Sequence, residues 1–159
     1  MNAKGKEIVR WAFTPIPHAA TQARRKLAAQ LRTWGISTAD AEPVLLVAYE
    51  LVANAVEHAR TALELAVSFD STTVVVEVSD ESPLEPQLQP FHLAAVRGRG
   101  LQMVAALSKS WNWVRRGGGK TIRAVIVPGL RLVALLACVA NRASATCAAG
   151  SPRAGWQPA

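Results

Sequence analysis

Hydrophobic residues recur along the chain with two different spacings, which predict helices in some segments and strands in others. Steps of three or four residues, which are typical of a helix, occur over residues 19–34, 41–59 and 101–108. Apolar runs, and runs that alternate apolar with polar residues, are typical of strands and cover residues 8–14, 63–69, 72–79, 111–114 and 121–127. The predicted order is therefore strand, helix, helix, strand, strand, helix, strand, strand.

This order predicts an α+β fold of two layers, in which helices cover one face of a mixed, mostly antiparallel sheet. Asp70 and Ser71 form a predicted turn between two strands, and the glycines at 117–119 form another. Prolines interrupt residues 83–90, so we expect a loop before the third helix. Residues 1–128 form the predicted domain, and residues 129–159 form a separate C-terminal tail.

The tail and the N-terminus bear on where the protein works. The most apolar stretch of the tail, residues 132–140, is shorter than the roughly 20 residues of a membrane-spanning helix. We expect it to form a short helix against protein, and the rest of the tail to be mobile. Near the N-terminus, Glu7 and Arg10 interrupt the apolar run that a secretion signal needs. These features predict a cytoplasmic protein that does not bind a membrane.

The composition fits one globular domain. Hydrophobic residues make up 50% of the chain and charged residues 18%, which allows a buried core, and 10 Gly, 9 Pro and 2 Cys exclude collagen-like and disulfide-rich classes. Residues 1–128 hold 15 Lys and Arg against 11 Asp and Glu, whereas the tail holds three Arg and no acid. The domain is therefore only weakly basic. Because no strand interleaves basic with aromatic residues, we predict no nucleic-acid binding.

The helix predicted over residues 41–59 carries polar side chains along an otherwise apolar segment. Glu50, Asn54 and His58 follow at intervals of four residues, so a regular α-helix projects all three from one side. A carboxylate, a carboxamide and an imidazole on such a helix are costly unless they face a polar groove. The alternative is a solvated strip held by contacts between residues four apart. The helix alone leaves both interpretations open.

Two later positions add candidate ligand-binding groups. Asp80 ends an apolar strand, where its carboxylate can accept a hydrogen bond from the exocyclic amine of adenine, although an aspartate also commonly begins a turn. Gly98 and Gly100 precede the third helix, where free backbone N–H groups and missing side chains let a phosphate approach. Each signal is weak when taken alone.

Residues 117–121 imitate the end of a phosphate-binding P-loop. That motif needs a glycine five residues before Gly119, and this chain has Val114 there. The segment also lies between two predicted strands, whereas a P-loop joins a strand to a helix. We therefore predict a hairpin turn at these glycines.

Taken in order, these segments resemble the GHKL (Bergerat-fold) ATPases, and more narrowly the anti-sigma-factor serine kinases. The resemblance covers about residues 8 to 128. It is carried by the opening segment FTPIPHAATQARRKLAAQLRTWGI and by ELVANAVEHA at 50–59, VEVSDESP at 76–83, RGRGLQMV at 97–104 and GGGKTIRAVI at 117–126.

The resemblance implies binding of ATP with Mg²⁺ and a role for each matching residue. Asn54 would ligate Mg²⁺ through its side-chain oxygen, a ligand that this hard cation prefers. Glu50 would act as the general base that takes the proton of an attacking serine hydroxyl. Asp80 would bind the adenine amine.

The remaining matching residues are implied to surround the phosphates and the base. Gly98 and Gly100 would shape a lid over the phosphates, and Lys120 or Thr121 would lie near the nucleotide. His58 would either contact phosphate or stabilise the end of the helix.

The family resemblance also implies partners. It implies a regulator that phosphorylates a serine of an antagonist protein and sequesters a sigma factor, with a homodimer as its assembly. At the position of a superfamily glycine, this chain has Ser82, followed by Pro83. The alternative is a non-catalytic interaction module with weak or no nucleotide binding. Ser82 and the tail favour this alternative, and the pairing of Glu50 with Asn54 argues against it.

Overall fold

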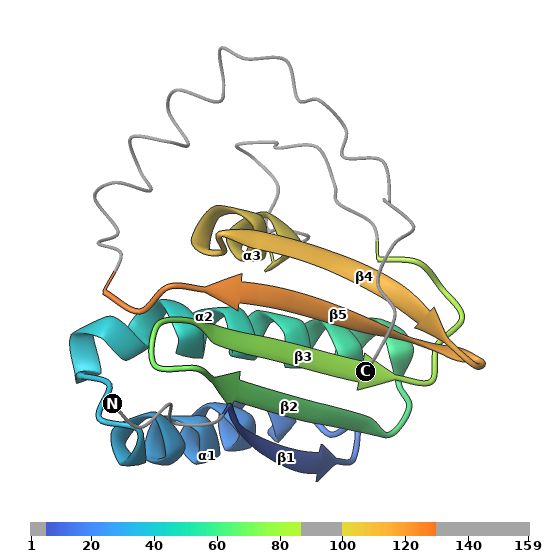
Figure 1. Cartoon of the computed structure of the whole chain (residues 1–159). Coiled ribbons are helices and arrows are strands. Elements are labelled where there is room, and N and C mark those ends of the chain that lie inside the picture. Colours follow the sequence, from blue (N-terminus) through green and yellow to red (C-terminus); the bar gives the residue numbers. More distant parts are fainter. Residues whose placement is uncertain (1–5, 87–99, 130–159) are drawn as a thin grey trace, which may run out of the picture.

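One five-stranded sheet forms the centre of the protein (Figure 1). The computed structural model describes residues 6–86 and 100–129. The strand order is β1-β2-β3-β5-β4, and each neighbouring pair of these strands is antiparallel. The predicted two-layer α+β sandwich is confirmed, and the described sheet is antiparallel throughout where the sequence predicted a mixed, mostly antiparallel one.

The elements occur in the predicted order, with ends that differ from the predicted ones by a few residues. They are β1 (Glu7–Phe13), α1 (Ala19–Thr33), α2 (Thr38–Asn54), the π-helix η1 (Ala55–Ala59), β2 (Leu63–Phe69), β3 (Val74–Asp80), α3 (Gly100–Leu107), β4 (Ser110–Arg116) and β5 (Gly119–Ile126). The predicted tail helix over residues 132–140 lies outside the described residues.

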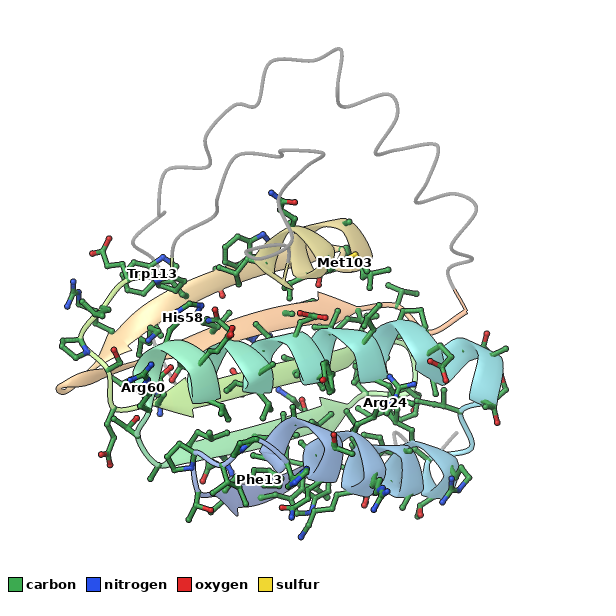
Figure 2. The ribbon with its side chains drawn as sticks, turned by 180° about the vertical axis from the view of Figure 1, so that it is seen from behind. Phe13, Arg24, His58, Arg60, Met103 and Trp113 are labelled. Atoms are coloured by element: carbon green, nitrogen blue, oxygen red, sulfur yellow. The ribbon has the colours of Figure 1, made fainter. Side chains whose placement is uncertain are left out.

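The helices α1 and α2 cover one face of the sheet. They lie behind it in Figure 1 and in front of it in Figure 2, which is turned by 180°. Their apolar stripes pack against alternate residues of the central strands, because successive side chains of a strand point to opposite faces. The fully buried side chains of this core include Leu27, Leu31, Val44, Val47, Leu51, Leu65, Val67, Val76, Val78 and Ile126. No described helix combines the length and the apolar character needed to cross a membrane.

The helix α2 begins earlier and ends earlier as an α-helix than its apolar spacing predicted. At its start, Ser37 caps the helix, since its hydroxyl oxygen accepts a hydrogen bond from the backbone N–H of Asp40 at 3.2 Å. At its end, Asn54 is followed by a π-turn in which the N–H of Arg60 donates to the carbonyl of Ala55 at 3.1 Å. The predicted single α-helix over residues 41–59 was therefore wrong in its last turn.

Asp70 holds the β2–β3 turn together. Its carboxylate accepts hydrogen bonds from the backbone N–H and the hydroxyl of both Thr72 and Thr73, at 2.7–3.0 Å. These four donors hold the pKa of the Asp70 carboxyl well below its ordinary value.

Replacing Asp70 with alanine is expected to lower the free energy of unfolding at pH 7 by about 1 kcal/mol, a modest amount because solvent reaches this carboxylate. A carboxylate with a lowered folded-state pKa stabilises the fold above its ordinary pKa and loses that contribution as the pH falls further. The difference between the wild type and Asp70→Ala should therefore shrink below pH 3.8, the ordinary value. Urea unfolding of the two proteins at pH 7 and at pH 3 measures this difference in unfolding free energy at each pH. A difference that does not depend on pH would contradict this account.

Candidate functional site

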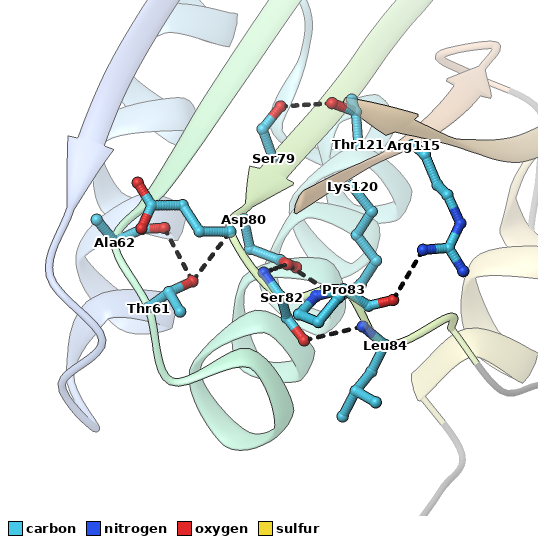
Figure 3. A network of polar contacts seen from close by, with 11 residues as sticks. Thr61, Ala62, Ser79, Asp80, Ser82, Pro83, Leu84, Arg115, Lys120 and Thr121 are labelled. Carbon is cyan, nitrogen blue, oxygen red and sulfur yellow. Dashed lines mark hydrogen bonds and ion pairs between the residues drawn. The ribbon is translucent and has the colours of Figure 1, made fainter. Parts of the chain in front are cut away.

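Asp80 and Lys120 form a buried ion pair at the end of β3. They are partners in the β3–β5 register, and Lys120 Nζ lies 2.9 Å from Asp80 Oδ1. Only 2% of the Asp80 side chain and 6% of the Lys120 side chain are exposed. The backbone N–H of Ser82 donates to the same Oδ1 at 2.9 Å. Figure 3 shows both donors converging on this carboxylate.

The loop that follows Asp80 is fixed by polar contacts on both sides (Figure 3). Ser82, at the position of the superfamily glycine, is buried, and its hydroxyl oxygen accepts the N–H of Leu84 at 3.3 Å. The backbone N–H of Glu81 donates to the hydroxyl of Thr61 at 3.0 Å. The serine is thus an integral part of this loop, which holds the Asp80 carboxylate in place.

Arg115 of β4 secures the same loop from the other side. Its guanidinium donates to the Pro83 carbonyl at 3.2 Å and to the Glu85 carboxylate at 2.9 Å. It also lies over the ring of Trp113, 5.9 Å from the ring centroid. Sequence reasoning missed Arg115, because nothing in its local sequence links it to a loop 30 or more residues earlier.

Lys120 and Thr121, which the sequence grouped together, lie on opposite faces of the sheet. Lys120 shares the helix-covered face with Asp80, whereas the Thr121 hydroxyl lies 2.8 Å from the hydroxyl of Ser79 on the other face. The reason is the alternation of side chains along a strand. Of the two residues that the sequence offered near a nucleotide, Lys120 is therefore the one beside the Asp80 carboxylate, and Thr121 lies on the opposite face.

Glu50 lies against the first residue of α3. A Cβ atom built on Gly100 would lie only 2.8 Å from Glu50 Oε2, so the glycine permits this close approach. Glu50 is half-buried, and its burial raises the pKa of its carboxyl. The structure thus brings together Glu50 and Gly100, two residues that the sequence placed in one site. Gly98 lies outside the described residues.

Asn54 and His58 differ in their surroundings. Asn54 is partly buried at the end of α2, and the η1 turn that follows it contacts β3, the strand that carries Asp80. His58 lies in η1, with 68% of its side chain exposed and its Nε2 atom 3.9 Å from the Glu57 carboxylate (Figure 2). A π-turn takes more residues than an α-turn. His58 therefore lies in a π-turn and not in the regular α-helix from which its alignment with Glu50 and Asn54 was predicted.

The described residues limit the metal chemistry that the protein side chains alone can supply. Within residues 6–86 and 100–129, no three His, Cys, Asp or Glu side chains cluster so as to hold a metal ion. Asn54, the predicted Mg²⁺ ligand, and Glu50, the predicted general base, lie one helical turn apart on α2.

Comparison with known proteins gives a family and a fold. The sequence profile of the family described as histidine kinase-like ATPase domain matches residues 13–126, well over half of the chain. The crystal structure of the RsbU and RsbW domains of Rv1364c from Mycobacterium tuberculosis is similar, with a TM-score of 0.59 and 20% identity over 77% of this chain. The match spans 33% of that longer chain.

A second solved structure has lower similarity. The catalytic domain of histidine kinase ThkA has a TM-score of 0.49 and 17% identity, and the match covers 77% of this chain and 96% of that domain. No protein of curated function matches the chain significantly.

Proposed function

The chain belongs to the histidine kinase-like ATPase domain family, and from this premise we propose that it is an ATP-binding regulatory kinase. In this proposal it phosphorylates a serine of an antagonist protein and sequesters a sigma factor in the cytoplasm. The observation that carries the proposal is the buried Asp80 carboxylate, held at the end of β3 by Lys120 and Ser82. Burying a carboxylate costs free energy unless an opposite charge and hydrogen bonds compensate it. A carboxylate held in this way is a suitable acceptor for the adenine amine.

The phosphate end of the proposed site is assigned to α2 and the start of α3. Asn54 would hold Mg²⁺ through its carboxamide oxygen, with the triphosphate and water supplying the other ligands, as that cation usually requires. When bound, Mg²⁺ would neutralise phosphate charge, which is the main requirement of phosphoryl transfer. Gly98 and Gly100 would allow the backbone at the start of α3 to approach the phosphates. His58, exposed beside this end of α2, remains a candidate phosphate contact.

Glu50 is the proposed general base. Its burial raises the pKa of its carboxyl, which makes the carboxylate a stronger base than an exposed glutamate. The proton of the partner's serine hydroxyl would pass to Glu50 as the serine oxygen bonds to the γ-phosphorus. The bond from that phosphorus to the bridging oxygen then breaks, and ADP leaves.

Phosphorylation would act as the switch between partners. A phosphate on the antagonist's serine adds negative charge, which weakens its fit to the regulator and frees the regulator to bind the sigma factor. The antagonist and the sigma factor are thus the proposed partners, and a homodimer is the proposed assembly. Both proposals follow from the motif resemblance.

A second candidate function is a non-catalytic interaction module. The observation that favours it is the Asp80–Lys120 pair, since an aspartate that already has a cation partner is stable without a nucleotide. The two candidate functions, a kinase and an interaction module, differ in whether the chain transfers phosphate to a partner.

Incubation with γ-labelled ATP, Mg²⁺ and candidate antagonists encoded near the same gene is expected to label a serine of one antagonist. Asn54→Ala should abolish both the labelling and the Mg²⁺-dependent part of ATP binding. The matched control is Gln22→Ala, at an exposed position of α1, which should leave both intact. ATP binding without transfer to any antagonist would contradict the kinase proposal and favour the interaction module.

A further inference from the structure

Asp80 and Lys120 are the buried charged residues in the part of the chain that the structure describes. Their strands place them directly opposite one another, and their ion pair lies on the face of the sheet that the helices cover. Removing two charges from water costs more free energy than one ion pair normally returns, unless further hydrogen bonds satisfy both groups. The donors and acceptors that this pair leaves unused therefore indicate which ligand could bind beside it.

That unused capacity has a defined pattern. An ammonium group has three N–H donors, and among the described residues one of them is accepted, by Asp80 Oδ1. The same Oδ1 also accepts the backbone N–H of Ser82. No donor from the described residues reaches the second oxygen, Oδ2. Within residues 6–86 and 100–129, the pair thus leaves one acceptor and two donors unused, next to one another.

This pattern matches one edge of adenine. On that edge the exocyclic amine at C6 donates a hydrogen bond, and the neighbouring ring nitrogen N1 accepts one. We propose that Lys120 Nζ donates to N1 while Asp80 Oδ2 accepts from the amine, so that Lys120 is a specificity-determining residue. The inference rests on the proposed function, in which Asp80 binds the base of ATP.

The same pair rejects purines that carry oxygen at C6. Guanine and hypoxanthine place an acceptor at C6 and an N1–H donor beside it, the reverse of adenine. In the same pose, the oxygen would meet the Asp80 carboxylate and the N1–H would meet the Lys120 ammonium. Both contacts are repulsive, and a site built to hydrogen-bond one pattern discriminates strongly when its own polar groups are left unpaired. An aspartate alone would supply only half of this discrimination.

Nucleotide analogues test the inference on the unmodified full-length chain. Dissociation constants for ATP, 1-deaza-ATP, 7-deaza-ATP and inosine triphosphate, measured by calorimetry with Mg²⁺, compare single changes in the base. Loss of the N1 acceptor should weaken 1-deaza-ATP about tenfold or more, because a hydrogen bond from a charged donor is lost. Inosine triphosphate should bind more weakly still, and 7-deaza-ATP should bind like ATP.

The outcomes separate the two proposals. Equal affinity for ATP and 1-deaza-ATP, or an equal loss for 1-deaza-ATP and 7-deaza-ATP, overturns the role of Lys120 and leaves the proposed function standing. Absence of ATP binding overturns the proposed function and the role of Lys120 with it.

A pair of variants gives a second test. Lys120→Met and Arg123→Met each remove one cation of β5 and one ion pair to β3. Arg123 pairs with Glu77 at 3.4 Å on the opposite face of the sheet, so it is a matched control. In Lys120→Met the ratio of the ATP and 1-deaza-ATP affinities should fall to about one, and in Arg123→Met it should stay at the wild-type value. Because the ratio compares two ligands on one protein, a loss of stability alone does not change it. An unchanged ratio in Lys120→Met overturns the inference, and if that variant does not fold, the analogue series on the wild type decides.

Discussion

Replacing Gly119 with alanine is expected to lower the free energy of unfolding by about 3 kcal/mol or more, or to prevent folding. A Cβ atom at this position would overlap the carbonyl oxygen of Asp80 and lie 2.8 Å from the Cα atom of Glu81. These are backbone atoms of the central strand and its exit, so they cannot move aside as the end of a flexible side chain can. The substitution would push β5 away from β3 and separate Lys120 from Asp80. Urea unfolding followed by circular dichroism measures the effect.

The matched control for this substitution is the neighbouring glycine. A Cβ atom on Gly118 would have no heavy atom within 4 Å, so Gly118→Ala should change the unfolding free energy by less than about 1 kcal/mol. If the two variants were equally stable, the close approach of Gly119 to β3 would not be essential to the fold. Nucleotide binding offers a second measurement, since Gly119→Ala should also weaken ATP binding by displacing Lys120.

Replacing Glu50 with glutamine is expected to lower the rate of phosphoryl transfer by a factor of about 10² to 10⁴, the usual contribution of a general base. The amide keeps the shape of the side chain beside Gly100 but cannot take the proton of the serine hydroxyl. ATP binding should be retained. The transfer rate under single-turnover conditions, measured with a labelled antagonist, tests this expectation.

The raised pKa of Glu50 adds two checks on this expectation. A carboxylate acts as a base only when it is ionised. As the pH is lowered, the wild-type transfer rate should therefore begin to fall at a pH above 4.5, the ordinary pKa of a glutamate, because Glu50 takes up a proton there. Burial of the charged form costs stability above that pKa, and glutamine removes this cost. Glu50→Gln should therefore be as stable as the wild type at pH 7, or more stable.

Glu42→Gln is the matched control, since it makes the same chemical change on the same helix. Glu42 is exposed and lies 2.8 Å from the guanidinium of Arg24 on α1. Its variant should keep the wild-type transfer rate. If Glu50→Gln transferred phosphate as fast as Glu42→Gln, Glu50 would not be the base.

Local patterns in the sequence were sufficient to predict which segments form helices and strands. The bounds predicted for β2 agree with the structure. The glycine-rich segment after β4 is the predicted hairpin turn, with a left-handed φ of 56° at Gly117. These features depend on neighbours in the chain, because apolar spacing and turn residues act over a few positions.

The type of the last turn of α2 was not predictable in this way. Over residues 55–59 the apolar spacing is compatible with a regular α-helix, and the sequence contains no breaking residue there. The turn instead takes the π form where it packs against β3 and ends in the left-handed Arg60. The π form of this turn, which the local sequence did not predict, therefore sets where His58 lies.

The amino-acid sequence was sufficient to predict the elements, their order and the family-like motifs, because these depend on patterns over a few neighbouring residues. The tertiary structure alone decided that Asp80 meets Lys120, a residue 40 positions later in the chain. It also decided that Thr121 faces away from them and that Glu50 meets the start of α3. Strand alternation predicts that Lys120 and Thr121 face opposite sides of the sheet, but the register between β3 and β5 settles that Lys120 lies opposite Asp80. That register is a long-range pairing, and no local pattern in the chain specifies it.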